Sequence, residues 1–212
     1  MRVWQTVLFT CVLMSAVVVP AYSVSGVEVS GDLNLSGTGT VSFPDGSKQT
    51  TAACRYEDNG DGTVTDCRSG LIWLKDANCL ANLGGIDRTS PGRLNWTDAG
   101  AWVGGLGNGF CGLNDLSVPG DWRLPTWLEW TAMVAYARSR YNLPALTDAA
   151  GTAQWTTGHP FLNVVSDFYW SASSNAGNAG YAWVVSMASG DVYPNGIKTT
   201  DLFYVWPVHG GQ

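Results

Sequence analysis

The stretch Gly120-Asp-Trp-Arg-Leu-Pro-Thr126 is the strongest indicator of the fold of this chain, because it combines a turn, a buried cation and the start of a helix. Trp122 is expected in the core. Arg123 beside it needs a carboxylate or carbonyl partner, since a buried guanidinium without hydrogen bonds is costly. Pro125 helps to fix the helix start. The Thr-x-x-Glu spacing from Thr126 to Glu129 is a capping box, which predicts a helix directly after the proline.

Two further segments carry tryptophans expected in the core: Tyr169-Trp-Ser-Ala-Ser173 with Trp170, and Tyr204-Val-Trp-Pro-Val208 with Trp206. With the first stretch, they resemble the C-terminal domain family of the collagen-like bacterial adhesin Lcl, a relative of C-type-lectin-like and formylglycine-generating-enzyme-like domains. The resemblance covers residues 55–212. It implies an α+β fold: a C-type-lectin-like domain with an antiparallel sheet, two helices and long loops.

The N-terminal residues predict an export signal over residues 1–23. Arg2 supplies the positive start, Val3 to Val19 the apolar run, and Pro20-Ala-Tyr-Ser23 a small-residue cleavage site. A membrane span is the alternative, but a Gly/Ser-rich polar segment follows instead of a charged stop-transfer cluster. We therefore expect a secreted, periplasmic or cell-surface protein with no membrane span after cleavage.

The charge balance limits the class of partner. One of the eleven Lys and Arg residues lies in the signal, and all seventeen Asp and Glu residues follow it. The exported chain therefore has ten cationic and seventeen acidic residues, which gives a net charge of −7. This argues against nucleic acid and anionic membranes, which require concentrated Lys and Arg. Eleven tryptophans and twenty-six glycines against 13% charged residues favour a turn-rich domain around an aromatic core.

Residues 24–53 predict a β-rich neck. Val-Glu-Val-Ser-Gly-Asp and Leu-Asn-Leu-Ser-Gly-Thr repeat a short strand and a turn, and such strands need neighbours to bury their apolar side. The following segment, Val41 to Ala52, resembles trimerising segments of phage fibres and other trimeric stalks. We favour a short homotrimeric neck, with a flexible linker as the alternative.

Residues 54–212 form the predicted globular domain. Arg55 to Asp66 carries a Gly/Asn/Asp centre between strand-like flanks, which predicts a β-hairpin, and Gly70 to Leu74 predicts a buried strand. Helices are expected over Asn95 to Leu106, weakened by its glycines, and after Thr126, where the apolar repeat includes Leu128, Met133, Val134 and Ala137. Short strands are expected over residues 169–173, 181–187, 191–193 and 203–208, with polar loops at residues 174–180 and 194–201.

The hairpin also offers oxygen donors of the kind that calcium takes: Asp58, Asn59, Asp61 and Asp66. The segment departs from the helix-loop-helix calcium pattern, because Arg68 stands at the twelfth position. A tight hairpin explains the same residues without an ion and is the favoured interpretation. Calcium is the one cofactor that the sequence suggests.

Four cysteines follow the signal and allow three pairings. If the hairpin arms pair, Cys54 and Cys67 lie opposite each other and can close it. The family resemblance implies a second disulfide between Cys79 and Cys111. A metal or redox site is the rival interpretation, but the chain has no Cys-x-x-Cys pair and two histidines.

The C-terminal segments carry the candidate ligand-binding residues, which combine aromatic faces with amide, carboxylate and amine groups: Asn175, Asn178, Tyr181, Asp191, Tyr193, Asn195, Lys198 and Tyr204. Tyrosine gives contact area at low entropic cost and asparagine adapts its hydrogen bonds. The alternative is that they are ordinary polar loop residues. In position, this region also resembles the variable segment of lectin-fold proteins diversified by retroelements.

We expect a noncatalytic adhesion or recognition module that binds a glycan or protein ligand. His159 and His209 lack an accompanying Gly-x-Ser-x-Gly motif, and Glu57 and Glu129 are explained by the hairpin and the helix cap. The alternative is a structural subunit or tip of an extracellular fibre or envelope assembly. The resemblance implies sulfated polysaccharide ligands, but the net charge of −7 and His209, where relatives often carry Arg, favour an uncharged glycan or a protein.

Overall fold

The computed structural model describes residues 40–42, 48–50, 54–82, 91–138, 144–156 and 158–210. The predicted signal peptide and the hexapeptide units of the neck lie outside these residues. Inside the predicted neck, β1 (Thr40–Ser42) pairs antiparallel with β2 (Lys48–Thr50). Among the helices that the structure describes, none combines the length and apolar character needed to cross a bilayer.

Within its described residues, the globular part consists of short strands, two α-helices and one 3-10 helix. Its elements follow in the order β3 (Tyr56–Asp58), β4 (Thr63–Asp66), β5 (Ile72–Leu74), η1 (Cys79–Asn82), β6 (Arg93–Leu94), α2 (Trp96–Gly104), β7 (Trp122–Arg123), α3 (Trp127–Arg138), β8 (Phe168–Asn175), β9 (Asn178–Ser186), β10 (Asp191–Ile197), β11 (Phe203–Tyr204) and β12 (Val208–His209).

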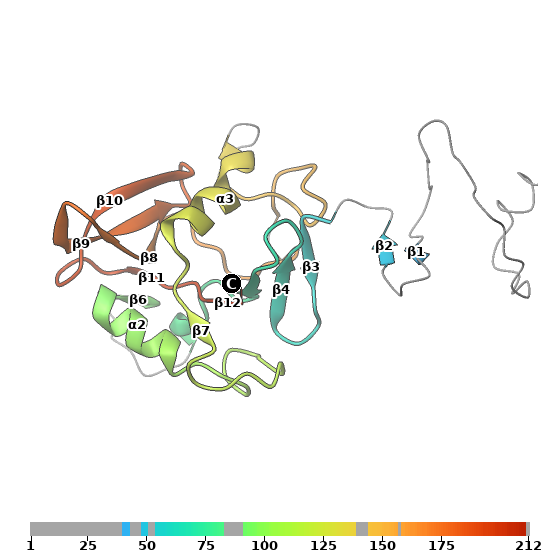
Figure 1. Ribbon diagram of the computed structural model, residues 1–212, viewed down its shortest axis with the longest axis horizontal. Coiled ribbons are helices and arrows are strands. Elements are labelled where there is room, and N and C mark those ends of the chain that lie inside the picture. The colour runs from blue at the N-terminus through green and yellow to red at the C-terminus, as the bar shows by residue number, and fades with distance from the viewer. Residues whose placement is uncertain are drawn as a thin grey trace, which may run out of the picture. The chain divides into compact units, whose positions relative to one another are not determined.

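These strands form two five-stranded sheets where the sequence predicts one. The first sheet has the order β3-β4-β5-β12-β7 and is antiparallel throughout. The second sheet has the order β10-β9-β8-β11-β6 and is antiparallel except for the parallel pair β8–β11. Figure 1 shows β8, β9 and β10 at one end of the domain and the β3–β4 hairpin at the other. The α+β class follows from these sheets and the two helices.

The C-terminal segment joins the two sheets. We predict one strand over residues 203–208, and this is wrong: β11 belongs to the second sheet and β12 to the first. Between them lies Trp206, which is fully buried. Its ring contacts four other core aromatics, with centroid distances of 5.5, 5.9, 4.9 and 5.8 Å to Trp73, Trp130, Phe161 and Tyr169. The core therefore sits where the final segment crosses from one sheet to the other.

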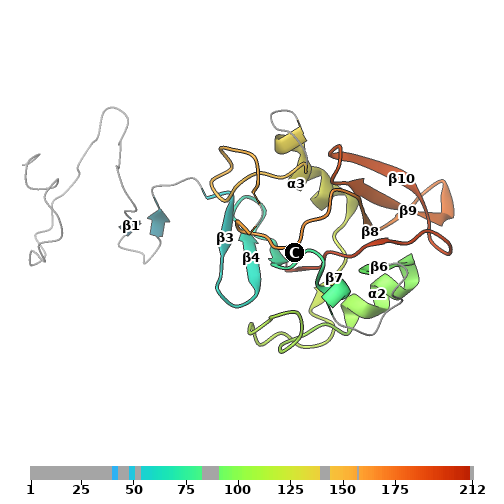
Figure 2. The same cartoon turned by 180° about the vertical axis from the view of Figure 1, so that it is seen from behind.

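Both helices begin with a capping side chain. The Asn95 side chain accepts a hydrogen bond from the Asp98 backbone N–H at the start of α2, at 3.0 Å. At the start of α3, Thr126 and Glu129 each accept a hydrogen bond from the other's backbone N–H, at 3.3 and 2.7 Å. These bonds satisfy N–H groups that have no partner within the helix. Figure 2 shows α2 beside β6 and β7.

One residue of the apolar pattern predicted for α3 is misplaced. Leu128 is 59% exposed, while Trp130 is fully buried together with Met133, Val134 and Ala137. Positions 130, 133, 134 and 137 repeat at intervals of three and four residues, which keeps them on one helix face. Leu128 precedes Trp130 by two residues, about 200° around the helix axis, and so points elsewhere.

The two disulfides are confirmed. Cys54 pairs with Cys67 beside the β3–β4 hairpin, and Cys79 pairs with Cys111, with Cα–Cα distances of 5.9 and 5.5 Å. The hairpin register places Tyr56 opposite Asp66, so the two cysteines flank the paired arms as the sequence predicts.

The predicted C-terminal loops are shorter than expected. Residues 174–180 belong mainly to β8 and β9, which a turn at residues 176–177 connects. Similarly, β10 continues to Ile197, with a change of register between Tyr193 and Gly196. Polar composition suggested loops, but backbone pairing between neighbouring strands extends almost to the hairpin tip. The candidate ligand-binding residues are therefore held largely on strands.

Candidate functional site

The eight predicted ligand-binding residues do not form one site, and two of them shape the turn between β8 and β9. The Asn175 side-chain oxygen accepts a hydrogen bond from the Gly177 N–H at 2.8 Å, and that of Asn178 accepts one from the Gly180 N–H at 3.0 Å. The Asn175 amide nitrogen also donates to the Pro194 carbonyl at 2.7 Å. These asparagines act as local turn residues, a role that competes with ligand binding.

Lys198 and Tyr204 are held by contacts within the domain. The Lys198 ammonium donates to the Ser174 hydroxyl at 2.6 Å and lies 4.1 Å from the centre of the Trp96 ring. The ring of Tyr204, half-buried, lies between the Arg93 guanidinium at 4.8 Å and Tyr169 at 5.4 Å. Cation–π contacts of this kind stabilise the position of an aromatic ring.

Tyr193 and Asp191 lie together on β10. The Tyr193 hydroxyl donates to an Asp191 carboxylate oxygen at 3.1 Å, and the other oxygen pairs with Arg138 at 2.5 Å. Hydrogen bonding from Ser189, with smaller contributions from Tyr193 and Arg138, outweighs desolvation and holds the pKa of Asp191 below its ordinary value. Asn195 is exposed where the β10 register shifts. Asp191 therefore stays an ionised hydrogen-bond acceptor on the sheet surface.

Three aromatic side chains form a continuous row on one face of the second sheet. Phe168 contacts Tyr193 at 6.2 Å and Phe203 at 5.4 Å between ring centres. We call Tyr193, Phe168 and Phe203 the aromatic row. Phe168 and Phe203 are half-buried, and Tyr193 is 37% exposed. The row presents aromatic surface from three different strands, β8, β10 and β11.

A buried tryptophan supports this row. Trp170 is fully buried and contacts Phe203 at 4.7 Å. Its indole N–H donates to the Leu94 carbonyl at 2.7 Å, which fixes the ring. Trp170 and Tyr193 both pair with Val184, so they lie on the same sheet face. The row is therefore positioned by the sheet and by the fixed ring of Trp170, which packs against Phe203 on the same face.

One ion pair adjoins the aromatic row: Arg138 pairs with Asp191, which Tyr193 also contacts. A second, between Arg93 and Asp167 at 2.5 Å, lies on the opposite face of the sheet, because Arg93 pairs in register with Tyr204, the residue after Phe203. All four side chains are partly exposed. Each pair is neutral as a whole, yet it presents donors and acceptors to solvent. The row can therefore offer ring faces and hydrogen bonds without a net charge.

Sequence reasoning selected Tyr193 and missed Phe168 and Phe203, because it favoured polar residues in expected loops. The available signal was the alternation Phe168-Tyr-Trp170, which places the first and third residues on one face of a strand. It also missed a second aromatic group on the opposite face. There, Trp183 of β9 stacks on Trp127 of α3 with ring centres 4.9 Å apart and planes 19° from parallel.

The four residues that suggested calcium bind protein side chains. Asp66 binds Arg55, and both side chains are buried. Asp58 binds the Lys75 ammonium at 2.6 Å, and Asp61 accepts from the Thr63 hydroxyl at 2.6 Å. The Asn59 amide donates to Thr63 and Thr65, at 2.7 and 3.0 Å. These bonds stabilise the β3–β4 hairpin.

The three hairpin aspartates do not converge. In the described part of the chain, three His, Cys, Asp or Glu ligand atoms lie within 4.8 Å of one another only at Cys54, Glu57 and Cys67. There the two sulfur atoms form a disulfide, so they are not thiolate ligands. This geometry gives no preformed metal centre among these residues.

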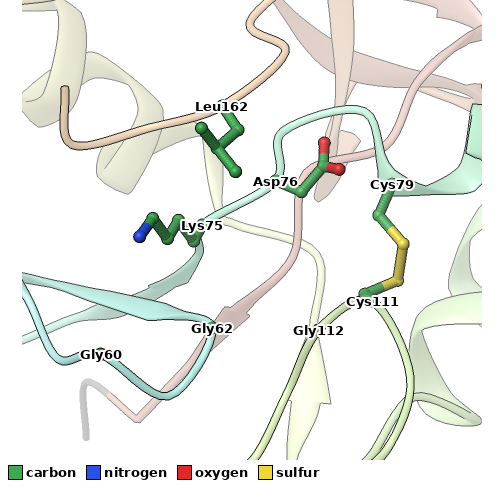
Figure 3. Close-up of a pocket in the computed structure, with 8 residues that line it drawn as sticks. All are labelled: Gly60, Gly62, Lys75, Asp76, Cys79, Cys111, Gly112 and Leu162. Atoms are coloured by element: carbon green, nitrogen blue, oxygen red, sulfur yellow. A yellow bond between two sulfur atoms is a disulfide. The ribbon is translucent and has the colours of Figure 1, made fainter. Parts of the chain in front are cut away.

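A pocket of about 550 Å³ lies between the β3–β4 hairpin and the Cys79–Cys111 disulfide (Figure 3). Its walls are glycine backbone, the disulfide and three side chains, from Gly60, Gly62, Lys75, Asp76, Cys79, Cys111, Gly112 and Leu162. Its charged groups have partners inside the protein: Lys75 binds Asp58, and Asp76 accepts from the Asn78 N–H at 3.0 Å. None of the eight predicted ligand-binding residues lines it.

Sequence comparison identifies the family to which this domain belongs. The model of the Lcl C-terminal domain matches residues 62–209, which include both sheets from β4 to β12 and both α-helices. The chain belongs to the Lcl C-terminal domain family. It has no match among curated proteins or solved structures. The matched region of this Lcl C-terminal domain contains the whole aromatic row, the Trp127–Trp183 stack and the pocket residues from Gly62 onward.

Proposed function

We propose that this Lcl C-terminal domain is a noncatalytic recognition or adhesion module that binds a glycan or protein ligand through the aromatic row. The observation that carries the proposal is the continuous contact of Tyr193, Phe168 and Phe203 on one sheet face. Aromatic rings supply large contact areas, and they lose little conformational entropy when they are fixed before binding. Here β8, β10 and β11 fix them.

Two arginine side chains around the second sheet are paired, which favours an uncharged ligand surface. Arg93 and Arg138 each pair with a carboxylate, Asp167 and Asp191 respectively. A sulfated polysaccharide would require cations that are not already compensated, and the whole chain carries a net charge of −6. A neutral glycan or a protein surface can instead use the Arg138–Asp191 pair beside Tyr193 as a hydrogen-bond donor and acceptor.

The proposal also includes the location of the module, its fold and its assembly. The two disulfides support an oxidising location, either outside the cell or in the periplasm. We further propose a C-type-lectin-like arrangement for the two sheets, and a homotrimeric neck formed by residues 24–53. The alternating hexapeptide units of the neck support the trimer, because each unit needs a neighbour to bury its apolar side.

The test is a binding screen with the purified protein against panels of neutral and sulfated glycans, matrix proteins and cell surfaces. We expect saturable binding that Tyr193→Ala weakens about tenfold, which corresponds to about 1.4 kcal/mol. Leu116→Ala is the matched control, because Leu116 is an apolar residue exposed by 83% on the loop between α2 and β7. Binding to no panel member would contradict the proposal and favour a structural subunit of a fibre or envelope assembly.

A further inference from the structure

The face of the second sheet opposite the aromatic row carries a stacked pair of tryptophans. Val184 pairs with Trp170 on the row side, so the preceding residue, Trp183, points to the other face. There its ring stacks on Trp127, with centres 4.9 Å apart and planes 19° from parallel. Both side chains are half-buried. The pair therefore adds aromatic surface that the proposed recognition site does not use.

The stack is held in place by its backbone surroundings. Trp127 is the first residue of α3, and its N–H donates to the Ser173 hydroxyl of β8 at 3.2 Å. Its carbonyl accepts a hydrogen bond from Thr131 at 2.8 Å. Trp183 lies inside β9, which pairs with β8 and β10 on its two sides. A ligand would meet rings that are already positioned, which lowers the entropic cost of binding.

The two indole N–H groups have no partner among the described residues and are open to solvent, unlike those of the core tryptophans Trp73 and Trp155, which are unpaired but buried. Within the described residues, five tryptophans donate their indole N–H to protein acceptors: Trp96, Trp122, Trp130, Trp170 and Trp206. The indoles of Trp127 and Trp183 donate to no described residue. Neither nitrogen is among the buried unpaired polar atoms, so both reach solvent. Each stacked ring therefore has a free donor at its edge.

A third donor lies on the same face. Tyr181 is two residues before Trp183 on β9, so the two side chains point to the same side of the sheet. Its hydroxyl has no partner among the described residues and is likewise not buried. Ile197, opposite Tyr181 on β10, is 39% exposed. None of these four side chains, from Trp127, Tyr181, Trp183 and Ile197, is charged.

We infer that Trp127, Trp183 and Tyr181 form a second binding site, for an uncharged pyranose ring of a glycan. The apolar C–H face of a pyranose fits against an aromatic ring, while its hydroxyl oxygens accept from the indole N–H and phenol O–H groups. A lipid tail or an apolar helix would cover the same rings but leave these donors unpaired, which is unfavourable. The inference rests on the proposed glycan-binding function and adds a site on the opposite sheet face.

The test follows the indole N–H resonances of the ¹⁵N-labelled protein during titration with neutral oligosaccharides: cellohexaose, chitohexaose and a β-1,4-galactan fragment. Trp127→Phe and Trp183→Phe assign the two signals. We expect at least one probe to shift both of them, while the Trp206 signal stays in place, because that buried indole donates to the Leu74 carbonyl at 2.7 Å. Trp183→Ala should weaken this probe's binding about tenfold or more.

Two outcomes would overturn the inference. One is that no probe shifts the two signals at about 10 mM, roughly ten times a 1 mM dissociation constant. The other is that only uncharged phosphatidylcholine vesicles shift them, which would assign the stack to a lipid surface. Tyr193→Ala separates this inference from the proposed function, because it alters the aromatic row only. Shifts at Trp127 and Trp183 that persist in this variant support a second site.

Discussion

The Arg123 guanidinium binds both carboxylate oxygens of Glu129, at 2.8 and 2.6 Å. The same guanidinium donates to the Leu124 and Gly210 carbonyls, at 3.2 and 3.0 Å. Glu129 also accepts the Thr126 N–H that begins α3. One ion pair therefore connects β7, the cap of α3 and the chain after β12. This is the structural reason for an arginine next to the core tryptophan Trp122.

Removing this guanidinium should destabilise the domain without changing its fold. We expect Arg123→Ala to lower the free energy of unfolding by about 2 kcal/mol, because it leaves the partly buried Glu129 carboxylate without its charged donor. Glu129→Gln should cost less, about 1 kcal/mol, since an amide oxygen can still accept the Thr126 N–H. Urea unfolding followed by tryptophan fluorescence measures both. An Arg123→Ala midpoint equal to that of the unaltered protein would contradict the role assigned to the pair.

The same pair makes stability depend on pH in the acid range. Burial alone would raise the pKa of Glu129, but hydrogen bonds from Arg123 and Thr126 outweigh it and lower the pKa. A carboxyl group with a lowered pKa in the folded state contributes stability above its unfolded pKa, about 4.3 for Glu. That contribution is lost as the pH falls through the folded-state pKa. The stability difference between the unaltered protein and Glu129→Gln should therefore shrink below about pH 4, as urea titrations at successive pH values would show.

Gly196 is expected to tolerate no side chain. A Cβ at this position would lie 2.5 Å from Cζ3 of Trp170 and 2.7 Å from Cγ1 of Val184. The Trp170 ring is fixed by its bond to Leu94, so it cannot move aside easily. Gly196→Ala should lower the free energy of unfolding by about 1–3 kcal/mol. Gly100→Ala in α2 is the control, because nothing lies within 4 Å of its Cβ position, and it should be neutral or stabilising. Equal thermal midpoints for the two variants would contradict this packing.

The two disulfides should differ in their effect on stability. Cys79 and Cys111 are separated by 32 residues, and Cys54 and Cys67 by 13. Restriction of the unfolded chain then stabilises the domain by about 3.7 kcal/mol for the longer loop and by about 2.9 kcal/mol for the shorter one. Replacing each pair by serines and measuring chemical unfolding checks the order. A greater loss of unfolding free energy on replacing the Cys54–Cys67 pair would show that chain entropy does not set this difference.

Local patterns in the sequence predicted the local parts of the fold. The hairpin over β3 and β4, the Thr126–Glu129 capping box and the Cys54–Cys67 disulfide depend on neighbours in the chain or on motifs with fixed spacing. The pairing of Cys79 with Cys111 was implied by the family resemblance instead. The division into two sheets depends on distant partners. Val208 pairs with Trp73 and Arg123, while Tyr204 pairs with Tyr169 and Arg93. A six-residue apolar segment contains no information that separates these two sets of partners.

In the candidate site, too, contacts between distant parts of the chain were not predictable from local sequence patterns. Polar composition identified the C-terminal segments, and Tyr193 lies exposed there beside the partly exposed Asp191. It could not show that Asn175 and Asn178 are engaged in the β8–β9 turn, because their hydrogen bonds depend on the strand ends. The stack of Trp127 on Trp183 joins a helix and a strand far apart in the sequence. Alternation in β9 indicates which residues share a face, but only packing shows what lies against them.

A structure of the domain bound to the ligand found in the binding screen would show directly whether the aromatic row is the binding site. We predict that the ligand contacts the rings of Tyr193 and Phe203 and hydrogen-bonds to the Arg138–Asp191 pair. A ligand held instead in the pocket lined by Lys75 and Leu162, with the aromatic row open to solvent, would contradict this prediction.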